Sequence, residues 1–109
     1  MSMKQHTVTI ANGGTTSEAI RMDSYAFGGL ILPGTLTSTA CTFTVCNTAG
    51  GTFVPLADAT GAHFSITVAA SHAIAITGTA GEALAPWAFI KLVFGSAEGG
   101  DRLVTIVLK

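Results

Sequence analysis

Residues 40–47 of the chain read ACTFTVCN, and this stretch decides the fold class. Cys41, Phe43 and Val45 fall on one side of an extended backbone and the threonines between them fall on the other, because successive side chains of a β-strand point to opposite faces. A strand with one apolar face and one polar face is typical of an antiparallel sheet that packs on a core with one side. The stretch therefore predicts a central strand of an all-β domain.

Short runs of the same kind recur on both sides of this strand, separated by glycine, proline, asparagine and aspartate. We expect further strands at residues 6–10, 18–22, 25–32, 52–56, 63–69, 72–76, 87–95 and 101–109. Residues 78–86 are irregular, with one helical turn at 82–85, and no longer stretch has the apolar period of a capped helix. The pattern predicts an antiparallel β-sandwich of about eight or nine short strands.

Glycine and proline positions refine this strand pattern. Gly28 and Gly29 predict a β-bulge or a close approach of another backbone. Pro55 has no N–H to give to a ladder, so the strand at 52–56 is expected at the edge of a sheet. The run at 87–95 is apolar apart from Lys91, which makes it a candidate for burial on both faces.

The length of the chain, 109 residues, matches one ordinary domain. We expect residues 13–109 to form a single β-sandwich domain. Residues 1–12 form an N-terminal strand or arm, which either pairs in the sheet or reaches out to a neighbouring molecule.

The chain carries little charge. Charged residues make up 10% of it, against roughly 25% in a typical soluble domain, and the net charge is −1. Five lysines and arginines, spread from Lys4 to Lys109, are too few and too scattered for the basic patch that nucleic acid requires. A neutral exterior suits close contact with other proteins, because little charge has to be desolvated. The composition favours an assembly component; the alternative is a Thr- and Ser-rich sandwich that is simply soluble.

No segment predicts a membrane span or an export signal. The longest apolar stretches, such as 87–94, are far shorter than the roughly 20 residues of a spanning helix. Residues 1–6 have one positive charge but no long apolar core of the kind that a secretory signal has. We expect a protein that is made in the cytoplasm, has no export address of its own and has no membrane partner.

The cysteines and histidines do not form a metal-binding pattern. Cys41 and Cys46 lie five positions apart in one expected strand, so they point to opposite faces, and we expect two unpaired thiols. His63 and His72 approach each other if their strands form a hairpin, with Asp58 nearby, but the spacing of a metal site is missing. We expect no metal and no cofactor.

The carboxylates do not gather into a catalytic pattern either. All six fall in expected turns or at strand ends, where solvated turn and cap residues are expected: Glu18, Asp23, Asp58, Glu82, Glu98 and Asp101. No nucleophile motif and no phosphate-binding loop is present in the sequence. We therefore expect no catalytic residue and no enzymatic activity.

Several segments together carry a resemblance to a known group of proteins. They are 17–21 (SEAIR), the glycine-containing strand that ends at 32–33 (LP), 42–45 (TFTV), 89–92 (FIKL) and 101–108 (DRLVTIVL). Over about residues 15–109 this pattern resembles small virion proteins of tailed bacteriophages, in particular capsid decoration (cement) proteins with a jelly-roll-like β-sandwich. The chain differs from that group in the cysteines of its central strand and in the few acidic residues at 50–61, where a longer polar hairpin is expected.

This resemblance implies a structural protein on the capsid surface of a virion. Such a protein binds the shell as a homo-oligomer, with a trimer favoured, and bridges neighbouring copies of the major capsid protein. The contacts are expected from the N-terminal segment, the apolar edge strand and the loop before residue 87, through Lys4, His6, Phe53, Val54, Leu56, Leu84 and Trp87.

Trp87 also supports a second class of function. Exposed aromatic rings stack on sugars, so a carbohydrate- or receptor-binding β-sandwich module is the alternative to a virion protein. The same indole is expected in a core or an interface, beneath the loop 78–86, if it serves as an apolar anchor. A buried Trp87 favours the virion protein, and an exposed aromatic platform favours the sugar-binding module.

Overall fold

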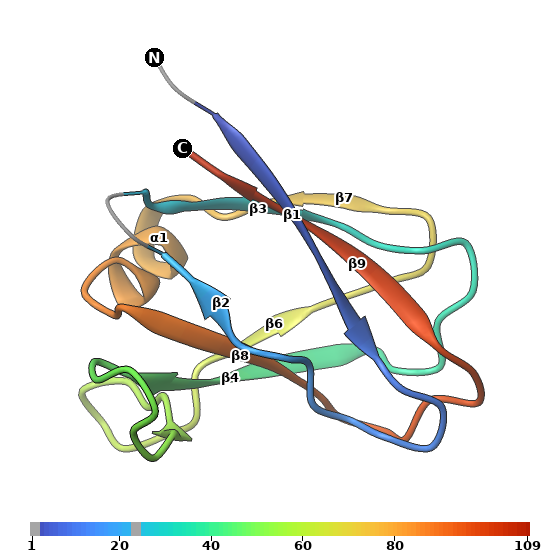
Figure 1. Cartoon of the computed structure of the whole chain (residues 1–109), viewed down its shortest axis with the longest axis horizontal. Helices are drawn as coiled ribbons and strands as arrows, with labels where there is room; N and C mark the ends of the chain where they lie inside the picture. The colour runs from blue at the N-terminus through green and yellow to red at the C-terminus, as the bar shows by residue number, and fades with distance from the viewer. Residues whose placement is uncertain (1–2, 23–24) are drawn as a thin grey trace.

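The computed structural model describes residues 3–22 and 25–109, and these residues form nine β-strands and one short helix. The elements in chain order are β1 (Lys4–Ile10), β2 (Ile20–Arg21), β3 (Phe27–Ile31), β4 (Ala40–Cys46), β5 (Val54–Pro55), β6 (Ser65–Thr67), β7 (Ala73–Ala75), α1 (Gly78–Leu84), β8 (Phe89–Phe94) and β9 (Arg102–Leu108). Figure 1 shows the strands in two layers, with the start of β1 and the end of β9 side by side.

Both layers are antiparallel sheets. Sheet A has the strand order β1-β9-β3-β7, and sheet B has the order β2-β8-β4 followed by β5 and β6. β5 pairs with Thr44 and Val45, and β6 pairs with residues 40–42. Because β8 occupies the other edge of β4, β5 and β6 together fill one strand position. The chain alternates between the sheets in the strand order of a jelly roll, which confirms the expected sandwich.

The inward faces of the two sheets form an apolar core. Its almost completely buried side chains include Val8, Ile10, Phe27, Leu30, Phe43, Val45, Ile90, Leu92, Phe94, Val104, Ile106 and Leu108. The alternation in residues 40–47 is confirmed, since Cys41, Phe43 and Val45 are all inside. The ring of Phe43 meets that of Phe27 edge-on, with 6.1 Å between the centroids, and this contact joins sheet B to sheet A.

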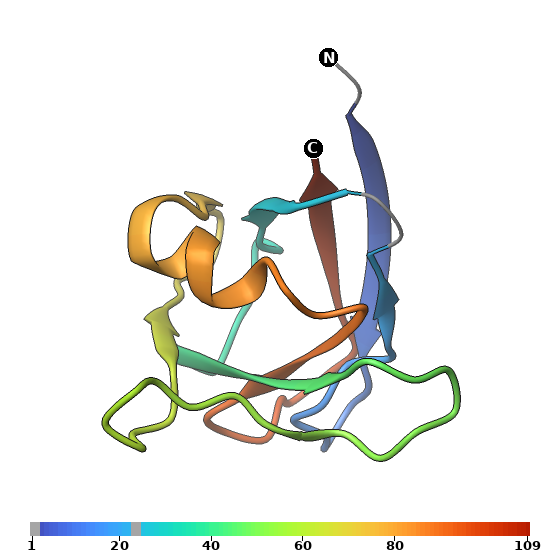
Figure 2. The same cartoon turned by 90° about the vertical axis from the view of Figure 1, so that its left-hand side faces the viewer.

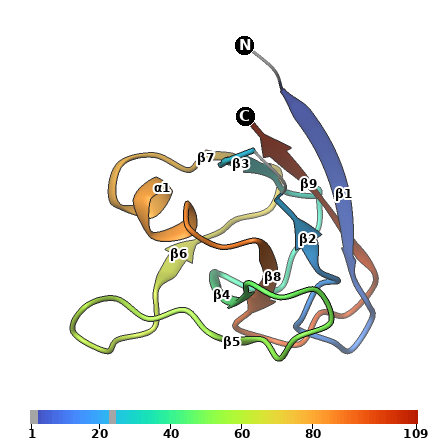
Figure 3. The same ribbon diagram turned by 60° about the vertical axis from the view of Figure 1, so that its left-hand side comes forward.

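The helix α1 lies beside the edge of the sandwich where β7 and β6 run (Figures 2 and 3). It is longer than the single turn expected at 82–85. Gly78 enters the helix at a φ of 57°, a conformation that glycine adopts without strain. Leu84, in the last turn, is fully buried and anchors the helix to the core.

Two expectations about individual strands are wrong. β8 is buried on one face only, because Phe89, Lys91 and Val93 are half-exposed on the outer face of sheet B. β6 and β7 do not form a hairpin, since β6 pairs with β4 in sheet B and β7 pairs with β3 in sheet A. The segment between them crosses from one sheet to the other, so no hairpin pairs His63 with His72.

The glycine pair in β3 is confirmed as a bulge with a close backbone approach. The register against β9 shifts between Phe27 and Gly29. A Cβ atom on Gly29 would lie 2.9 Å from the backbone oxygen of Ile74 in β7. The two strands can therefore pair at their present spacing only if residue 29 has no side chain.

We expect the substitution Gly29→Ala to lower the free energy of unfolding by about 1–3 kcal/mol, because β3 and β7 must move apart. Gly34→Ala is the matched control, since its Cβ would meet only the Ser71 hydroxyl at 3.8 Å. Urea unfolding of both variants measures the difference. Equal stability of the two variants would show that the strand spacing is not held by Gly29.

Candidate interaction surfaces

The predicted contact residues of the N-terminal segment lie on β1. Lys4 and His6 are exposed, and the Lys4 ammonium lies 5.7 Å from the centroid of the Tyr25 ring. β1 pairs with β9 from Lys4 to Ile10, so these residues belong to sheet A rather than to a detached arm.

The apolar edge at residues 53–56 is only partly on the surface. Val54 is 54% exposed in β5. β5 lies at the edge of sheet B, which is the position that the proline at residue 55 indicated. Phe53 is half-buried beneath the Lys91 ammonium, which lies 4.5 Å from its ring centroid. Leu56 directly follows β5, and its side chain is buried in the core. Its expected place at an interface is therefore corrected.

The two residues predicted around α1 have different positions. Leu84 is fully buried as the core anchor of the helix, so its expected place at an interface is also corrected. Trp87 is half-buried and packs against the core, and its Nε1 donates a hydrogen bond to the carbonyl oxygen of Ala83 at 2.8 Å. The indole is therefore only partly exposed, and the hydrogen bond to Ala83 ties it to α1.

A shallow pocket of about 380 Å³ opens beside this indole. Pro86 and the acidic residues Asp58 and Glu82 lie among its walls. Asp58 accepts hydrogen bonds from the hydroxyl and the N–H of Thr60, and these bonds lower the pKa of its carboxyl group. Asp58 is thus an ionised turn residue that stabilises the loop from Asp58 to Gly61.

The strand register assembles an uncharged surface on the outer face of sheet A. In β9, Val104, Ile106 and Leu108 point inward, so the residues between them point outward. The register places outward residues of β1, β3 and β7 beside them. We call the resulting set the neutral face; its members are Gln5, Thr7, Thr9, Gly29, Ile31, Ala73, Ala75, Leu103, Thr105 and Val107.

The neutral face has both projecting and recessed parts. Leu103 and Ile31 are 57% and 45% exposed, so two large apolar side chains project from this face. A hollow of about 330 Å³ lies over β3 and β7, where Gly28 and Gly29 have no side chains and Val107 forms one wall. The neutral face is therefore uncharged, with polar side chains on β1, two projecting apolar side chains and a hollow over β3 and β7.

The outer face of sheet B is different because it carries cations. Lys91 projects from β8 over Phe53, and Arg21 lies opposite Phe89 in the register of β2 and β8. A protein that covers this face takes Lys91 and Arg21 out of water, which costs desolvation energy. By contrast, none of the ten members of the neutral face carries a charge.

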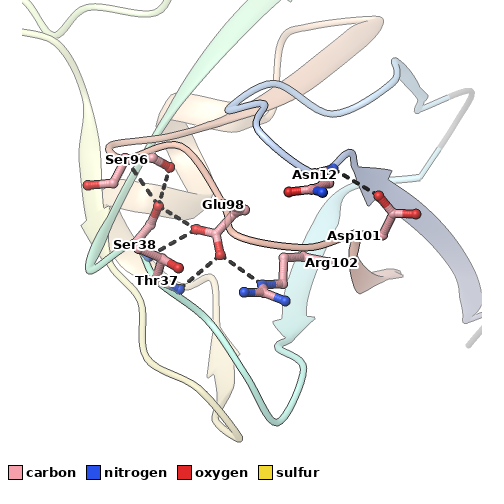
Figure 4. A network of polar contacts seen from close by, with 7 residues as sticks. All are labelled: Asn12, Thr37, Ser38, Ser96, Glu98, Asp101 and Arg102. Atoms are coloured by element: carbon pink, nitrogen blue, oxygen red, sulfur yellow. Dashed lines mark hydrogen bonds and ion pairs between the residues drawn. The ribbon is translucent and has the colours of Figure 1, made fainter.

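Glu98 is a buried carboxylate that joins three loops at one end of the sandwich (Figure 4). Its side chain accepts hydrogen bonds from the N–H groups of Thr37 and Ser38 at 2.8 and 2.9 Å, and from the Ser38 hydroxyl at 2.7 Å. The Arg102 guanidinium donates a further bond at 2.9 Å. The backbone of Glu98 bonds to Gly13 and Gly14 in the loop after β1.

These hydrogen bonds decide the charge of Glu98. Burial alone raises the pKa of this carboxyl group, but the bonds from Thr37, Ser38 and Arg102 outweigh it, and the pKa is about 2. Glu98 is therefore ionised at neutral pH. The expectation that it is a solvated turn residue is wrong, because its partners at Thr37 and Ser38 lie 61 and 60 positions away and no sequence spacing marks them.

Both cysteines are thiols, as expected, and lie on opposite sides of β4. Burial raises the pKa of Cys41 to about 12, so it stays protonated in the core. Cys46 lies under the turn after β4, where its Sγ is 3.1 Å from the carbonyl oxygen of Thr48. Gly51 closes this turn over Cys46, since a Cβ there would lie 2.7 Å from the sulfur.

Among residues 3–22 and 25–109, no group of three histidine, cysteine or acidic side chains is close enough to hold a metal ion. The expected carboxylate Asp23 lies outside the described residues. In the part of the chain that the structure describes, no helix is long and apolar enough to cross a membrane.

Comparison with known proteins identifies one related fold. No protein family and no curated protein matches the sequence. Among solved structures, the chain is similar to the SPBc2 prophage-derived protein YomS, with a TM-score of 0.56 and 14% sequence identity. The match covers 100% of this chain and 96% of that chain. At this identity the similarity shows that the two proteins share a β-sandwich fold over almost their whole lengths.

Proposed function

We propose that this chain is a structural protein of a bacteriophage particle, and more specifically a capsid decoration protein that bridges neighbouring subunits of the head shell. The neutral face is the observation that carries this proposal. A monomer normally keeps its surface charged and free of large apolar patches, whereas a surface without charge suits burial against protein. The prophage origin of YomS, a protein of the same fold, supports a phage origin for this chain.

The mechanism of such a protein is mass action. A protein that binds only the assembled shell stabilises it by RT ln(1 + [L]/Kd) per site, about 2.7 kcal/mol when the free protein is at a hundred times its Kd. Symmetry repeats this contribution over the whole shell, and bridging adds avidity because one molecule holds two subunits. No catalytic group, metal or cofactor is needed for this role.

The proposed partners are the major capsid protein and further copies of the chain, with the assembled protein on the outside of the virion head. The exposed residues Lys4, His6 and Val54 and the half-buried Phe53 and Trp87 remain the candidates for contacts with the shell. They lie outside the neutral face, so shell contacts and contacts between copies can form at the same time.

The test is sedimentation of the purified chain with expanded head shells of the phage that encodes it. We expect the chain to sediment with the shells and to raise the temperature at which they dissociate. Unassembled major capsid protein is the control, and we expect it not to bind. A chain that stays in the supernatant at saturating concentration, with shells no more stable than before, would contradict the proposal.

The alternative function is a carbohydrate- or receptor-binding module, and the pocket beside Trp87 is the observation that favours it. The indole of Trp87 offers an apolar wall to a sugar ring. The carboxylates of Asp58 and Glu82 offer hydrogen-bond acceptors for sugar hydroxyls. A glycan array distinguishes the two functions. Glycan binding that is lost in the variant Trp87→Ala would support the carbohydrate-binding module. An array without hits would contradict that module and favour the virion protein.

A further inference from the structure

We infer that two copies of this chain pair through their neutral faces, about a twofold axis that passes close to Thr105. This inference deepens the proposed function and rests on it for its biological meaning, but its evidence is the pattern of charge and shape on sheet A. The occupant of the neutral face is a second copy, because the face is complementary to itself.

Charge is the first part of this self-complementarity. The outward positions along β9 are Leu103, Thr105 and Val107. Asp101 precedes the strand, where its carboxylate accepts a hydrogen bond from the Asn12 N–H at 2.8 Å (Figure 4), and Lys109 follows the strand. Both charged residues are exposed. The backbone of Lys109 continues the ladder with Ala26, and its side chain lies close to Gly28. The row is thus neutral in the middle, acidic at one end and basic at the other.

A twofold axis through the middle of this row makes the charges match. Two β9 strands that face each other antiparallel about Thr105 place Asp101 of each copy opposite Lys109 of the other. Both strands have Thr105 at the centre, where two small uncharged side chains meet. The adjacent registers place Asp101 opposite Val107 or Lys109 opposite Leu103, and a charge against an apolar side chain costs desolvation energy.

Shape is the second part of the self-complementarity of the neutral face. Leu103 and Val107 lie four positions apart on β9, or about 13 Å at the rise of a strand. The same twofold axis carries the projecting Leu103 of one copy over Val107 and the glycine-lined hollow of the other. Each copy supplies one projection and one hollow, so two identical contacts form. This is the pattern of an isologous interface.

The area of the neutral face sets the expected affinity of the dimer. Four strands at about 4.8 Å spacing and seven residues of β9 give a face of roughly 19 by 23 Å, or about 440 Å² in projection. Standard interfaces bury about 800 Å² on each partner, and smaller ones are transient. We therefore expect a weak dimer in solution, with a Kd in the micromolar range or higher, that becomes stable on a shell where copies are held close together.

The first test uses the charge pattern. Asp101→Lys breaks two symmetric ion pairs and creates two like-charge contacts, so we expect it to weaken dimerisation by roughly tenfold. Lys109→Asp is expected to do the same, and the double variant is expected to dimerise again. Sedimentation velocity over a concentration series measures each Kd, and circular dichroism verifies the fold. Two single variants without effect, or a double variant that stays as weak as either, would overturn the inference.

The second test changes the residue on the inferred twofold axis. Thr105→Glu places two like charges together at the centre and is expected to abolish the dimer, whereas Thr44→Glu, at a half-buried threonine on the outer face of sheet B, is the matched control. A cysteine at position 105 is expected to give a species of twice the monomer mass with a short bifunctional maleimide. A wild-type protein that is monomeric at millimolar concentration, or a trimer that Thr105→Glu does not dissociate, would contradict the pairing.

These outcomes are separate from those of the shell-binding test. A chain that dimerises through residue 105 but does not sediment with shells contradicts the proposed function alone. A chain that sediments with shells while Thr105→Glu leaves its self-association unchanged contradicts the twofold pairing alone.

Discussion

Replacing Glu98 with alanine is expected to lower the free energy of unfolding by about 3–5 kcal/mol, which is a large share of the stability of a small domain. The variant loses the carboxylate that holds the N–H groups of Thr37 and Ser38, and it leaves the Arg102 guanidinium partly buried without its acceptor. The cost is high because unpaired buried donors keep their full desolvation penalty.

Urea unfolding at neutral pH measures this loss. Glu18→Ala is the matched control, because Glu18 is exposed and its carboxylate accepts one hydrogen bond, from the Thr9 N–H. We expect the control to lose less than about 1 kcal/mol. If Glu98→Ala and Glu18→Ala lose the same amount, the loops at this end of the sandwich are not held by Glu98.

The pKa of Glu98 gives this prediction a pH dependence. The folded-state pKa of about 2 lies below the ordinary value of 4.5, so the ionised carboxylate stabilises the fold above pH 4.5. This contribution, on the order of 3 kcal/mol, is lost as the pH falls from 4.5 towards 2. We expect Glu98→Gln to lack this acid-dependent loss, whereas the wild-type protein shows it in urea unfolding across that range.

Replacing Phe43 with alanine is expected to cost about 3–5 kcal/mol. Phe43 is 1% exposed, and its ring contacts Phe27 in sheet A and Phe64 on the segment that leads into β6. Its removal leaves a cavity between the two sheets. Phe53→Ala is the control for ring size, because Phe53 is half-buried on the outside of sheet B under Lys91.

Thermal unfolding followed by circular dichroism compares the two phenylalanine variants. We expect Phe43→Ala to lower Tm much more than Phe53→Ala. Similar shifts would show that the sheets are not held together through Phe43.

The strands were predictable because each carries its own local signal. In β4 the alternation of Cys41, Phe43 and Val45 with threonine shows directly which side is buried. Pro55 correctly marks an edge, and Gly28 and Gly29 correctly mark a bulge. In each case the physical cause lies within a few residues of the position that it explains.

The pairing of strands was not predictable, because it depends on residues far apart in the sequence. Ala69 to Ser71 look like a tight turn, yet β6 and β7 belong to different sheets. The reason is the jelly-roll strand order, in which the chain leaves sheet B after β6 and crosses to sheet A for β7. The short apolar segment Phe53–Leu56 likewise gives no sign that its last residue turns into the core.

The neutral face was not predictable for the same reason. The low charge of the chain suggested a neutral exterior, but it did not say where that exterior lies. Thr7, Thr105 and Ile31 become neighbours only through the order β1-β9-β3. From the sequence alone, contacts are expected at Lys4, His6, Phe53, Val54, Leu56, Leu84 and Trp87, whereas the strand register assembles an uncharged surface on sheet A.

We expect the neutral face to be covered by protein in the assembled particle, and thiol labelling measures this coverage. The variant Thr105→Cys places a thiol at the centre of that face, while Cys41 and Cys46 are buried and give a low background. We predict fast reaction with a maleimide reagent in the dilute purified chain and strong protection in intact phage particles. Equal labelling rates in the two states would show that the neutral face stays open to solvent and would contradict the account.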